Sequence, residues 1–185
     1  MAPKGGSFEI KDIKDIVGGI VPTGITFAAD GALYINDWKD SYDKKPTGRI
    51  WKLDVNEGLK NRNRTSTQNL LKNGLKGMNP EDLAVLLEHE DKRVRLASQF
   101  ELVKLADLTT FLKVVTKSKN LFAQLHAIWG IGQLGRKNNP LMAELLFLLN
   151  NENEHVRAQT AKVMGEAKFQ PALDKLINQT KGQRI

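Results

Sequence analysis

The sequence predicts a mainly α fold in which a short helical solenoid follows a small antiparallel β-meander. The strongest observation is the stretch of residues 121–135, whose apolar side chains recur at helical spacing. The second is an internal repeat, because Arg95, His126 and Arg157 follow one another at intervals of 31 residues in similar surroundings. The third is the pattern of residues 7–54, where short runs of β-forming residues alternate with turn residues.

Composition excludes several classes of site. The chain has 185 residues, 41% of them hydrophobic and 26% charged, which is typical of a globular protein. It contains no run of about eighteen apolar residues, so no membrane span is predicted, and its first six residues do not resemble a signal peptide. The absence of cysteine excludes thiol catalysis, zinc–thiolate sites and c-type haem attachment within these residues.

The net charge of +7 is spread along the chain. Residues 1–73 carry 12 Lys and Arg against 9 Asp and Glu, so they hold less than half of the excess. Only residues 55–78 are locally basic, and a solvated linker is the preferred interpretation, with a polyanion contact as the alternative. Nucleic-acid binding is therefore not expected.

The N-terminal part, residues 1–54, is predicted to be a β-meander of the size of one propeller blade, which needs neighbours to cover its faces and edges. The best hairpin signal is Asp30-Gly31, because glycine accepts the positive φ that tight turns require. Turn residues also occupy the polar loop 39–48. The expected strands are 8–13, 23–28, 32–36 and 49–53.

The C-terminal part, residues 79–185, is predicted to form helical repeats. Asn79-Pro80 announces the first helix, since Asn suits the N-cap position and Pro the first helical turn. Arg95, His126 and Arg157 are expected to form a structural ladder that bridges neighbouring turns through carboxylates or helix-end carbonyls. Trp129 is expected to lie between the first and third repeats, largely buried. The expected helices are 80–88, 92–106, 108–117, 120–135, 140–150, 153–167 and 171–180.

Two stretches resemble a known family. Residues 22–38, PTGITFAADGALYINDW, with GRIWKLD after them, resemble the last blade of bacterial propeller proteins related to glucose/sorbosone quinoprotein dehydrogenases. LLEHEDKRVRLASQFEL and LFAQLHAIWGIGQLGR resemble the HEAT-repeat region that follows that propeller. The repeat of 31 residues is shorter than the roughly 40 usual for HEAT units, which implies a compact HEAT-like variant.

The resemblance implies that the chain is a fragment of an exported or periplasmic, membrane-bound dehydrogenase-like protein. The parent protein would carry pyrroloquinoline quinone (PQQ), calcium and haem c, and its propeller and cytochrome c domains would be the partners of this chain. No cofactor, metal site or catalytic residue is expected in the chain itself, whose predicted role is that of a noncatalytic interaction or spacer scaffold. The alternative is that it contributes the closing blade to the catalytic unit of a quinone- or metal-dependent sugar oxidoreductase.

Three residues invite sharper interpretations. Asp37 and Trp38 end a predicted strand, where the carboxylate would bind a metal ion or a sugar hydroxyl, or else simply accept backbone hydrogen bonds. Trp129 in a basic helical solenoid also brings to mind HEAT-like DNA glycosylases, which hold DNA on a basic surface. Against that reading, the nearby lysines are not continued in the adjacent repeats. The lysines of that cluster are Lys113, Lys117 and Lys119.

Overall fold

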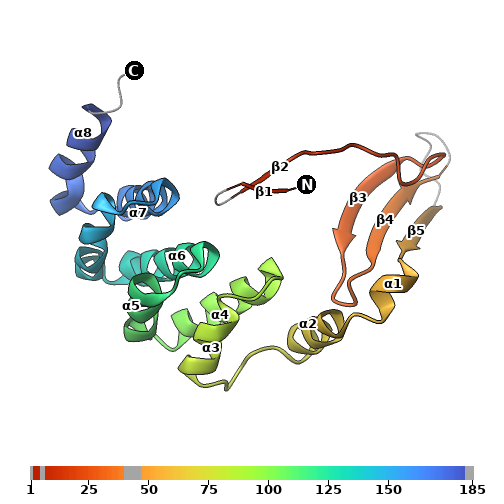
Figure 1. Ribbon diagram of the computed structural model, residues 1–185, viewed down its shortest axis with the longest axis horizontal. Coiled ribbons are helices and arrows are strands. Elements are labelled where there is room, and N and C mark those ends of the chain that lie inside the picture. The colour runs from red at the N-terminus through yellow and green to blue at the C-terminus, as the bar shows by residue number, and fades with distance from the viewer. Residues whose placement is uncertain (1, 5–6, 40–46, 182–185) are drawn as a thin grey trace. The chain divides into compact units, whose positions relative to one another are not determined.

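The computed structural model describes residues 2–4, 7–39 and 47–181, and it is mainly helical with a small antiparallel sheet (Figure 1). The predicted fold class is therefore confirmed. Contacts divide the chain into two compact units. The first, called here the sheet unit, runs from Ile10 to Gly74. The second, the helical unit, consists of residues 2–9 and the chain from Leu75 onwards.

In its described residues, the sheet unit contains three antiparallel strands rather than the predicted four. They are β3 (Pro22–Phe27), β4 (Leu33–Trp38) and β5 (Gly48–Leu53), with β4 in the centre. The prediction of a first strand in this sheet at 8–13 is wrong, because β2 (Ser7–Glu9) pairs with β1 (Ala2–Lys4) and belongs to the helical unit. Most of the predicted loop 39–48 lies outside the described residues.

The predicted hairpin at Asp30-Gly31 is confirmed. Strands β3 and β4 pair up to Phe27 and Leu33, and Ala28 donates its N–H to the carbonyl of Ala32 at 3.0 Å. Gly31 has φ +76°, a conformation that side chains disfavour. The Asp30 carboxylate accepts the N–H of Ala32 at 3.0 Å, which closes the turn.

The segment expected as a basic linker contains two helices, α1 (Asn56–Leu59) and α2 (Arg62–Asn73). The Asn61 side chain caps α2 by accepting the N–H of Asn63. Arg64 in α2 makes two hydrogen bonds of 2.7 Å to the Asp54 carboxylate, and its Nε donates to the carbonyl of Asp30. These bonds attach α2 to the end of β5 and to the β3–β4 turn, so its basic residues are part of the sheet unit.

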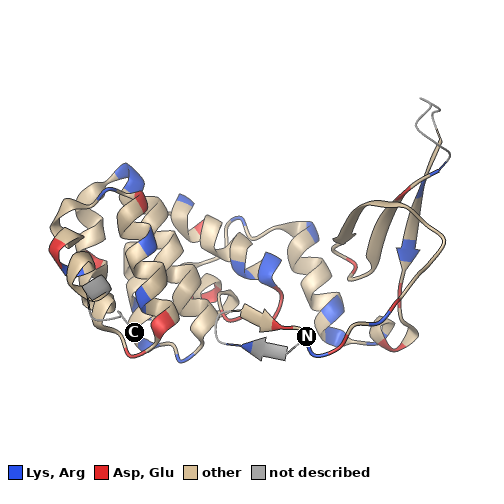
Figure 2. Cartoon of the chain, turned by 90° about the horizontal axis from the view of Figure 1, so that it is seen from above, with Lys and Arg blue, Asp and Glu red and all other residues tan. Residues whose placement is uncertain are grey.

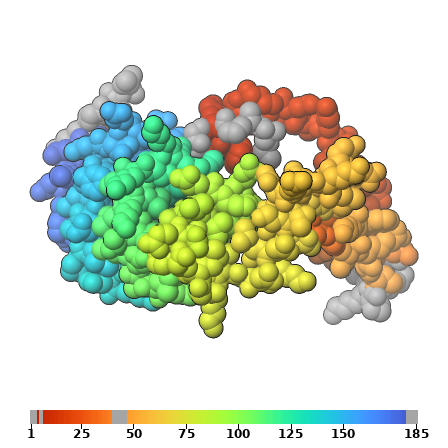
Figure 3. Space-filling view, turned by 60° about the horizontal axis from the view of Figure 1, so that its bottom comes forward, coloured from red at the N-terminus to blue at the C-terminus, as the bar shows by residue number. Residues whose placement is uncertain are grey.

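The helical unit consists of helices that follow one another in pairs, seen as successive colour bands in Figure 3. The expected helix at 140–150 is a 3₁₀ helix, and the last expected helix begins with a short 3₁₀ turn. The elements are α3 (Pro80–Leu86), α4 (Lys92–Lys104), α5 (Leu108–Lys117), α6 (Leu121–Lys137), η1 (Asn139–Asn150), α7 (Glu154–Glu166), η2 (Gln170–Ala172) and α8 (Leu173–Lys181).

Caps mark the helix starts of this unit. Five α-helices begin after an Asn or Asp whose side chain accepts a backbone N–H of the first turn, which satisfies one of the donors that a helix start leaves unpaired. The predicted start at Asn79-Pro80 is one of them and is confirmed. The five capping residues are Asn79, Asp91, Asp107, Asn120 and Asn153.

The repeat is also visible in the backbone at the helix ends. Ala106 after α4 and Lys168 after α7 have φ of +54° and +52° respectively. In both places the next residue donates its N–H to a carbonyl five residues back, as Asp107 does to Leu102 and Phe169 to Met164. This is the left-handed helix ending that usually favours glycine, and both repeats adopt it with other residues.

Glycines on α6 bring its neighbours close. A Cβ at Gly130 would overlap the ring of Phe111 in α5, and one at Gly135 would overlap Met142 in η1. A third Cβ, at Gly132, would lie 2.9 Å from Val163 in α7. Helix α6 therefore packs against three neighbours at short range, which places it at the centre of the unit.

Candidate interaction groove

The repeated arginines hold the turn before their own helix. Arg95 donates from Nη1 to the carbonyls of His89 and Glu90, at 2.7 and 2.8 Å. Arg157 does the same to Asn151 and Glu152, at 2.7 and 2.9 Å. The acceptors are carbonyls of the turn that follows the preceding helix, within the same repeat. The bonds thus fix the angle between the two helices of a pair rather than bridging to the next pair.

His126 occupies the equivalent place in the middle repeat but bonds to its neighbour. Its Nδ1 lies 2.7 Å from Oε1 of Gln99 in α4, and the side chain is only 3% exposed. Burial, and then the charges of Arg95 and Lys92, lower the pKa of His126 to about 4. The imidazole is therefore neutral at neutral pH, and a bond to the amide oxygen requires the proton on Nδ1.

Trp129 lies between α4 and α7, as expected from the repeat, but it is half-buried and reaches the surface. Its indole N–H donates to Oε1 of Gln159 in α7 at 2.8 Å, and its ring meets His126 edge-on with centroids 4.9 Å apart. The interior of the unit is filled by the next face of α6, including Ile128 and Ile131, which are completely buried. The indole is held in one orientation at the border of the core.

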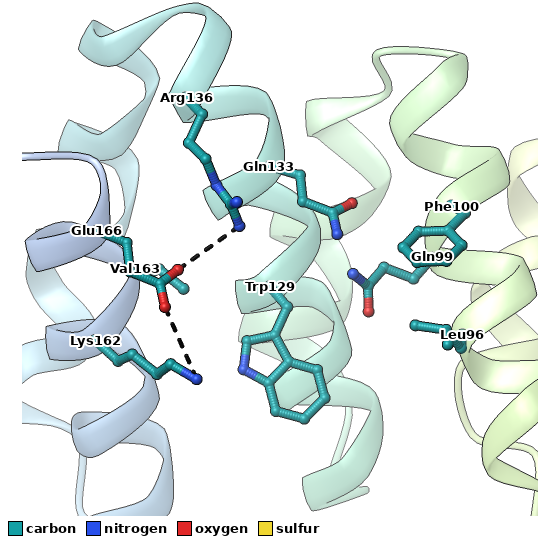
Figure 4. A pocket seen from close by; sticks show the side chains of 9 residues that line it. All are labelled: Leu96, Gln99, Phe100, Trp129, Gln133, Arg136, Lys162, Val163 and Glu166. Atoms are coloured by element: carbon teal, nitrogen blue, oxygen red, sulfur yellow. Dashed lines mark ion pairs between the residues drawn. The ribbon is translucent and has the colours of Figure 1, made fainter.

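Five residues follow one face of α6 at the spacing of a helical stripe: Phe122, His126, Trp129, Gln133 and Arg136. The C-terminal half of this stripe forms the floor of an open groove of about 510 Å³ between α4, α6 and α7. We call it the Trp129 groove. Figure 4 shows the indole in the middle of it, with side chains of α4 on one side and of α7 on the other.

The walls of the Trp129 groove differ in chemistry. Helix α4 contributes Phe100, a 43% exposed aromatic ring, and the amide of Gln99. Helix α7 contributes Lys162 and Glu166. Glu166 pairs with Lys162 at 3.8 Å and with Arg136 of α6 at 3.6 Å, as the dashed lines in Figure 4 mark. These pairs are exposed and long, so they stabilise the fold little and leave the groups available to a ligand.

Asp37 has a structural bonding pattern. Its Oδ1 accepts the N–H of Val21 and its Oδ2 the indole N–H of Trp51, both at 2.9 Å. The Trp51 bond, followed by that from Val21, lowers the pKa of this carboxyl group. Trp38 follows it in the strand and therefore points to the opposite face, where it is 51% exposed. The structure does not bring these two residues into one site.

Within residues 2–4, 7–39 and 47–181, no group of three or more His, Asp or Glu residues is close enough to hold a metal ion. Within the same ranges no helix is both long and apolar enough to cross a membrane. Basic and acidic side chains are interspersed over the helices (Figure 2).

The groove was not predicted as a site. Sequence reasoning singled out Trp129 and His126, but it missed Phe100, Gln133 and Lys162. The signal for Gln133 is the set of polar residues that interrupt the apolar pattern of α6, because His126, Gln133 and Arg136 share the face of Trp129. The walls come from other helices and have no such signal.

Comparisons with protein-family models, with curated proteins and with solved structures find no match to this chain.

Proposed function

We propose that the chain is a noncatalytic, HEAT-like interaction or spacer scaffold, a fragment of an exported sugar-dehydrogenase-like protein. The observation that carries the proposal is the Trp129 groove, in which a fixed indole ring and an exposed Phe100 face an open trough. Aromatic residues at the centre of a concave surface are the usual anchors of protein contacts. The link to a sugar dehydrogenase is supported by the resemblance alone, which covers residues 22–38, 48–54, 86–102 and 121–136.

The bonding of the three titratable residues at the repeated position also supports a scaffold. The Arg95 and Arg157 guanidinium groups bond to turn carbonyls, and the His126 imidazole bonds to an amide. An acid or base in catalysis has to meet a substrate proton, and its pKa lies near the working pH. His126 is buried with its pKa at about 4, which suits a packing role.

The test uses the domains encoded next to this chain in its parent gene. They are expressed separately, and their binding to the full chain is measured by calorimetry. Trp129→Ala is expected to weaken binding at least about tenfold, as the loss of a central aromatic anchor does. Phe147→Ala removes a comparably exposed ring, 51% accessible in η1 beside α5, and is expected to leave binding unchanged. Equal binding by both variants would contradict the proposal.

A second function is favoured by the sheet unit. Ile25 and Phe27 on β3, and Ile50 on β5, are 62%, 63% and 72% exposed, although they belong to types that sheets normally cover. A closing blade in the catalytic propeller of a quinone- or metal-dependent sugar oxidoreductase would find neighbours on both faces. Deleting residues 10–74 from the parent protein would then abolish dye-linked sugar oxidation with PQQ and calcium. Retained activity would exclude this alternative.

A further inference from the structure

We infer that the Trp129 groove binds an extended acidic peptide segment that carries an aromatic side chain. This inference rests on the proposed scaffold function and names the class of its partner. Three features of the helical unit support it: the shape of the groove, the amide groups along it, and the sign of its charges.

The shape suits an extended chain. The stripe from Phe122 to Arg136 runs along α6, and α4 and α7 bound its C-terminal part. At the other end of the same stripe, the structure already holds an extended segment: Phe8 of strand β2 stacks on Phe122, with ring centroids 6.4 Å apart and planes at 18°. An extended strand thus places an aromatic ring against this face of α6. The Trp129 groove offers the same arrangement two turns further on, between Trp129 and Phe100.

Amide side chains follow the groove. His126 takes the amide oxygen of Gln99, so the amino group of that amide is left as a hydrogen-bond donor. Gln133 lies one turn after Trp129 on α6, and its amide faces the space between α6 and α4 in Figure 4. The Gln133 amide can both donate and accept hydrogen bonds, and the Gln99 amino group can donate one, so the two groups match the carbonyls and N–H groups of an extended peptide backbone.

The charges select an acidic partner. Arg136 and Lys162 line the groove against one carboxylate, that of Glu166. Toward the Phe122 end, Lys92 is exposed, and like Arg95 it lies close enough to His126 for its charge to lower the pKa of that imidazole. The buried Nε of Arg95 makes no hydrogen bond to the described part of the chain. The groove therefore holds two cationic groups against one carboxylate, a balance that favours carboxylates over basic segments as ligands.

The experiment measures fluorescence anisotropy of labelled peptides with the full chain. The main probe has three tandem copies of Glu-Phe-Glu-Ser. In one matched probe Lys replaces Glu, and in another Ala replaces Phe. We expect saturable binding of the main probe, weaker at higher salt, and binding at least about tenfold weaker for both matched probes.

Charge-reversal variants keep the test independent of the core. Arg136→Glu combined with Lys162→Glu is expected to weaken binding of the main probe at least about tenfold. Lys113→Glu with Lys117→Glu makes the same change of charge on α5, outside the groove, and serves as the control. Trp129→Leu is expected to weaken binding to a similar degree, and circular dichroism with the unfolding midpoint verifies that each variant is folded.

The inference is overturned if the main probe does not bind, if the lysine probe binds as well, or if both charge-reversal pairs act alike. The outcomes separate it from the scaffold proposal. If binding of the flanking domains requires Trp129 but the acidic probe does not displace them, the scaffold proposal stands and the inference fails. If the acidic probe binds at the groove but binding of the flanking domains does not depend on Trp129, the inference stands and the scaffold proposal fails.

Discussion

At the scale of single residues, the side chains at equivalent positions of the repeat make different hydrogen bonds. Arg95 and Arg157 each hold a turn through two carbonyls, whereas His126 bonds to Gln99 of the neighbouring helix. The guanidinium of Arg95 also lies over the ring of Phe122, 4.7 Å from its centroid. The histidine thereby links two repeats, at a position where the other two repeats carry an arginine.

Acid is expected to destabilise the helical unit through His126. The folded state lowers its pKa from 6.5 to about 4, so the unfolded chain binds the proton more readily between these values. Stability is full above about pH 6.5 and falls as the pH drops toward about 4. The free energy of unfolding should decrease by about 2 kcal/mol between about pH 7 and about pH 5. Urea unfolding at the two pH values measures it.

The control for this prediction is a pair of histidine variants. His126→Gln removes the titrating group and should abolish most of the decrease, whatever its effect on stability at neutral pH. His155→Gln replaces a histidine in the first turn of α7 and should preserve the decrease. The same loss of stability in all three proteins would show that other groups cause it.

At the scale of elements, α6 depends on glycine for its close packing. Glycine lowers helix propensity by about 1 kcal/mol relative to alanine, and α6 carries three in its second half. Each faces a different neighbour, namely Phe111, Val163 and Met142. The propensity cost is thus offset by packing that a β-carbon would prevent.

Gly130→Ala is expected to destabilise the protein although alanine favours the helix. The added methyl group would overlap the Phe111 ring, which is completely buried. Overpacking of this kind costs up to about 3 kcal/mol, and the propensity gain offsets about 1 kcal/mol, which leaves a net loss of about 2 kcal/mol. Thermal or urea unfolding measures this value.

Two comparisons make the Gly130 result specific. Gly165→Ala in α7 adds a methyl group with no atom within 4 Å, so it should be neutral or stabilising by up to about 1 kcal/mol. Adding Phe111→Leu to Gly130→Ala should recover part of the lost stability, because the smaller side chain makes room. A Gly130→Ala protein as stable as the parent would mean that α5 and α6 pack less closely than described.

At the scale of the whole molecule, the division between the two units falls after α2 rather than at the end of the last strand. Arg64 is responsible, since it binds both the Asp54 carboxylate and the Asp30 carbonyl. The Arg64 bond lowers the pKa of Asp54 to about 2. A segment whose composition is that of a connector is thereby folded onto the sheet as a helix.

Arg64→Ala should loosen the sheet unit and leave the helical unit unchanged. Amide hydrogen exchange is the measurement, because it reports local opening residue by residue. Exchange of the β3 and β4 amides is expected to accelerate, and that of the buried α6 amides is expected to stay at the parent rate. Arg62→Ala, one residue after the cap of α2, is the control and should change neither. Faster exchange throughout both units would contradict the boundary at Gly74.

The sequence by itself determined what depends on near neighbours. Helix starts at Asn79 and its counterparts, the hairpin at Asp30-Gly31 and the spacing of the repeat follow from capping, turn chemistry and periodicity, which act over a few residues. For the same reason the equivalent positions of Arg95, His126 and Arg157 could be recognised before their partners were known.

Only the tertiary structure decided which groups meet across the chain. The stripe on α6 forms the floor of a groove because α4 and α7 lie on either side of it. The sequence of α6 does not specify which faces of those two helices border the stripe. Residues 62–73 become part of the sheet unit through Arg64, whose partners lie 10 and 34 residues away. Strand β2 is not part of the predicted sheet because it pairs with β1 instead. Such pairings depend on long-range geometry and burial, which local propensities do not specify.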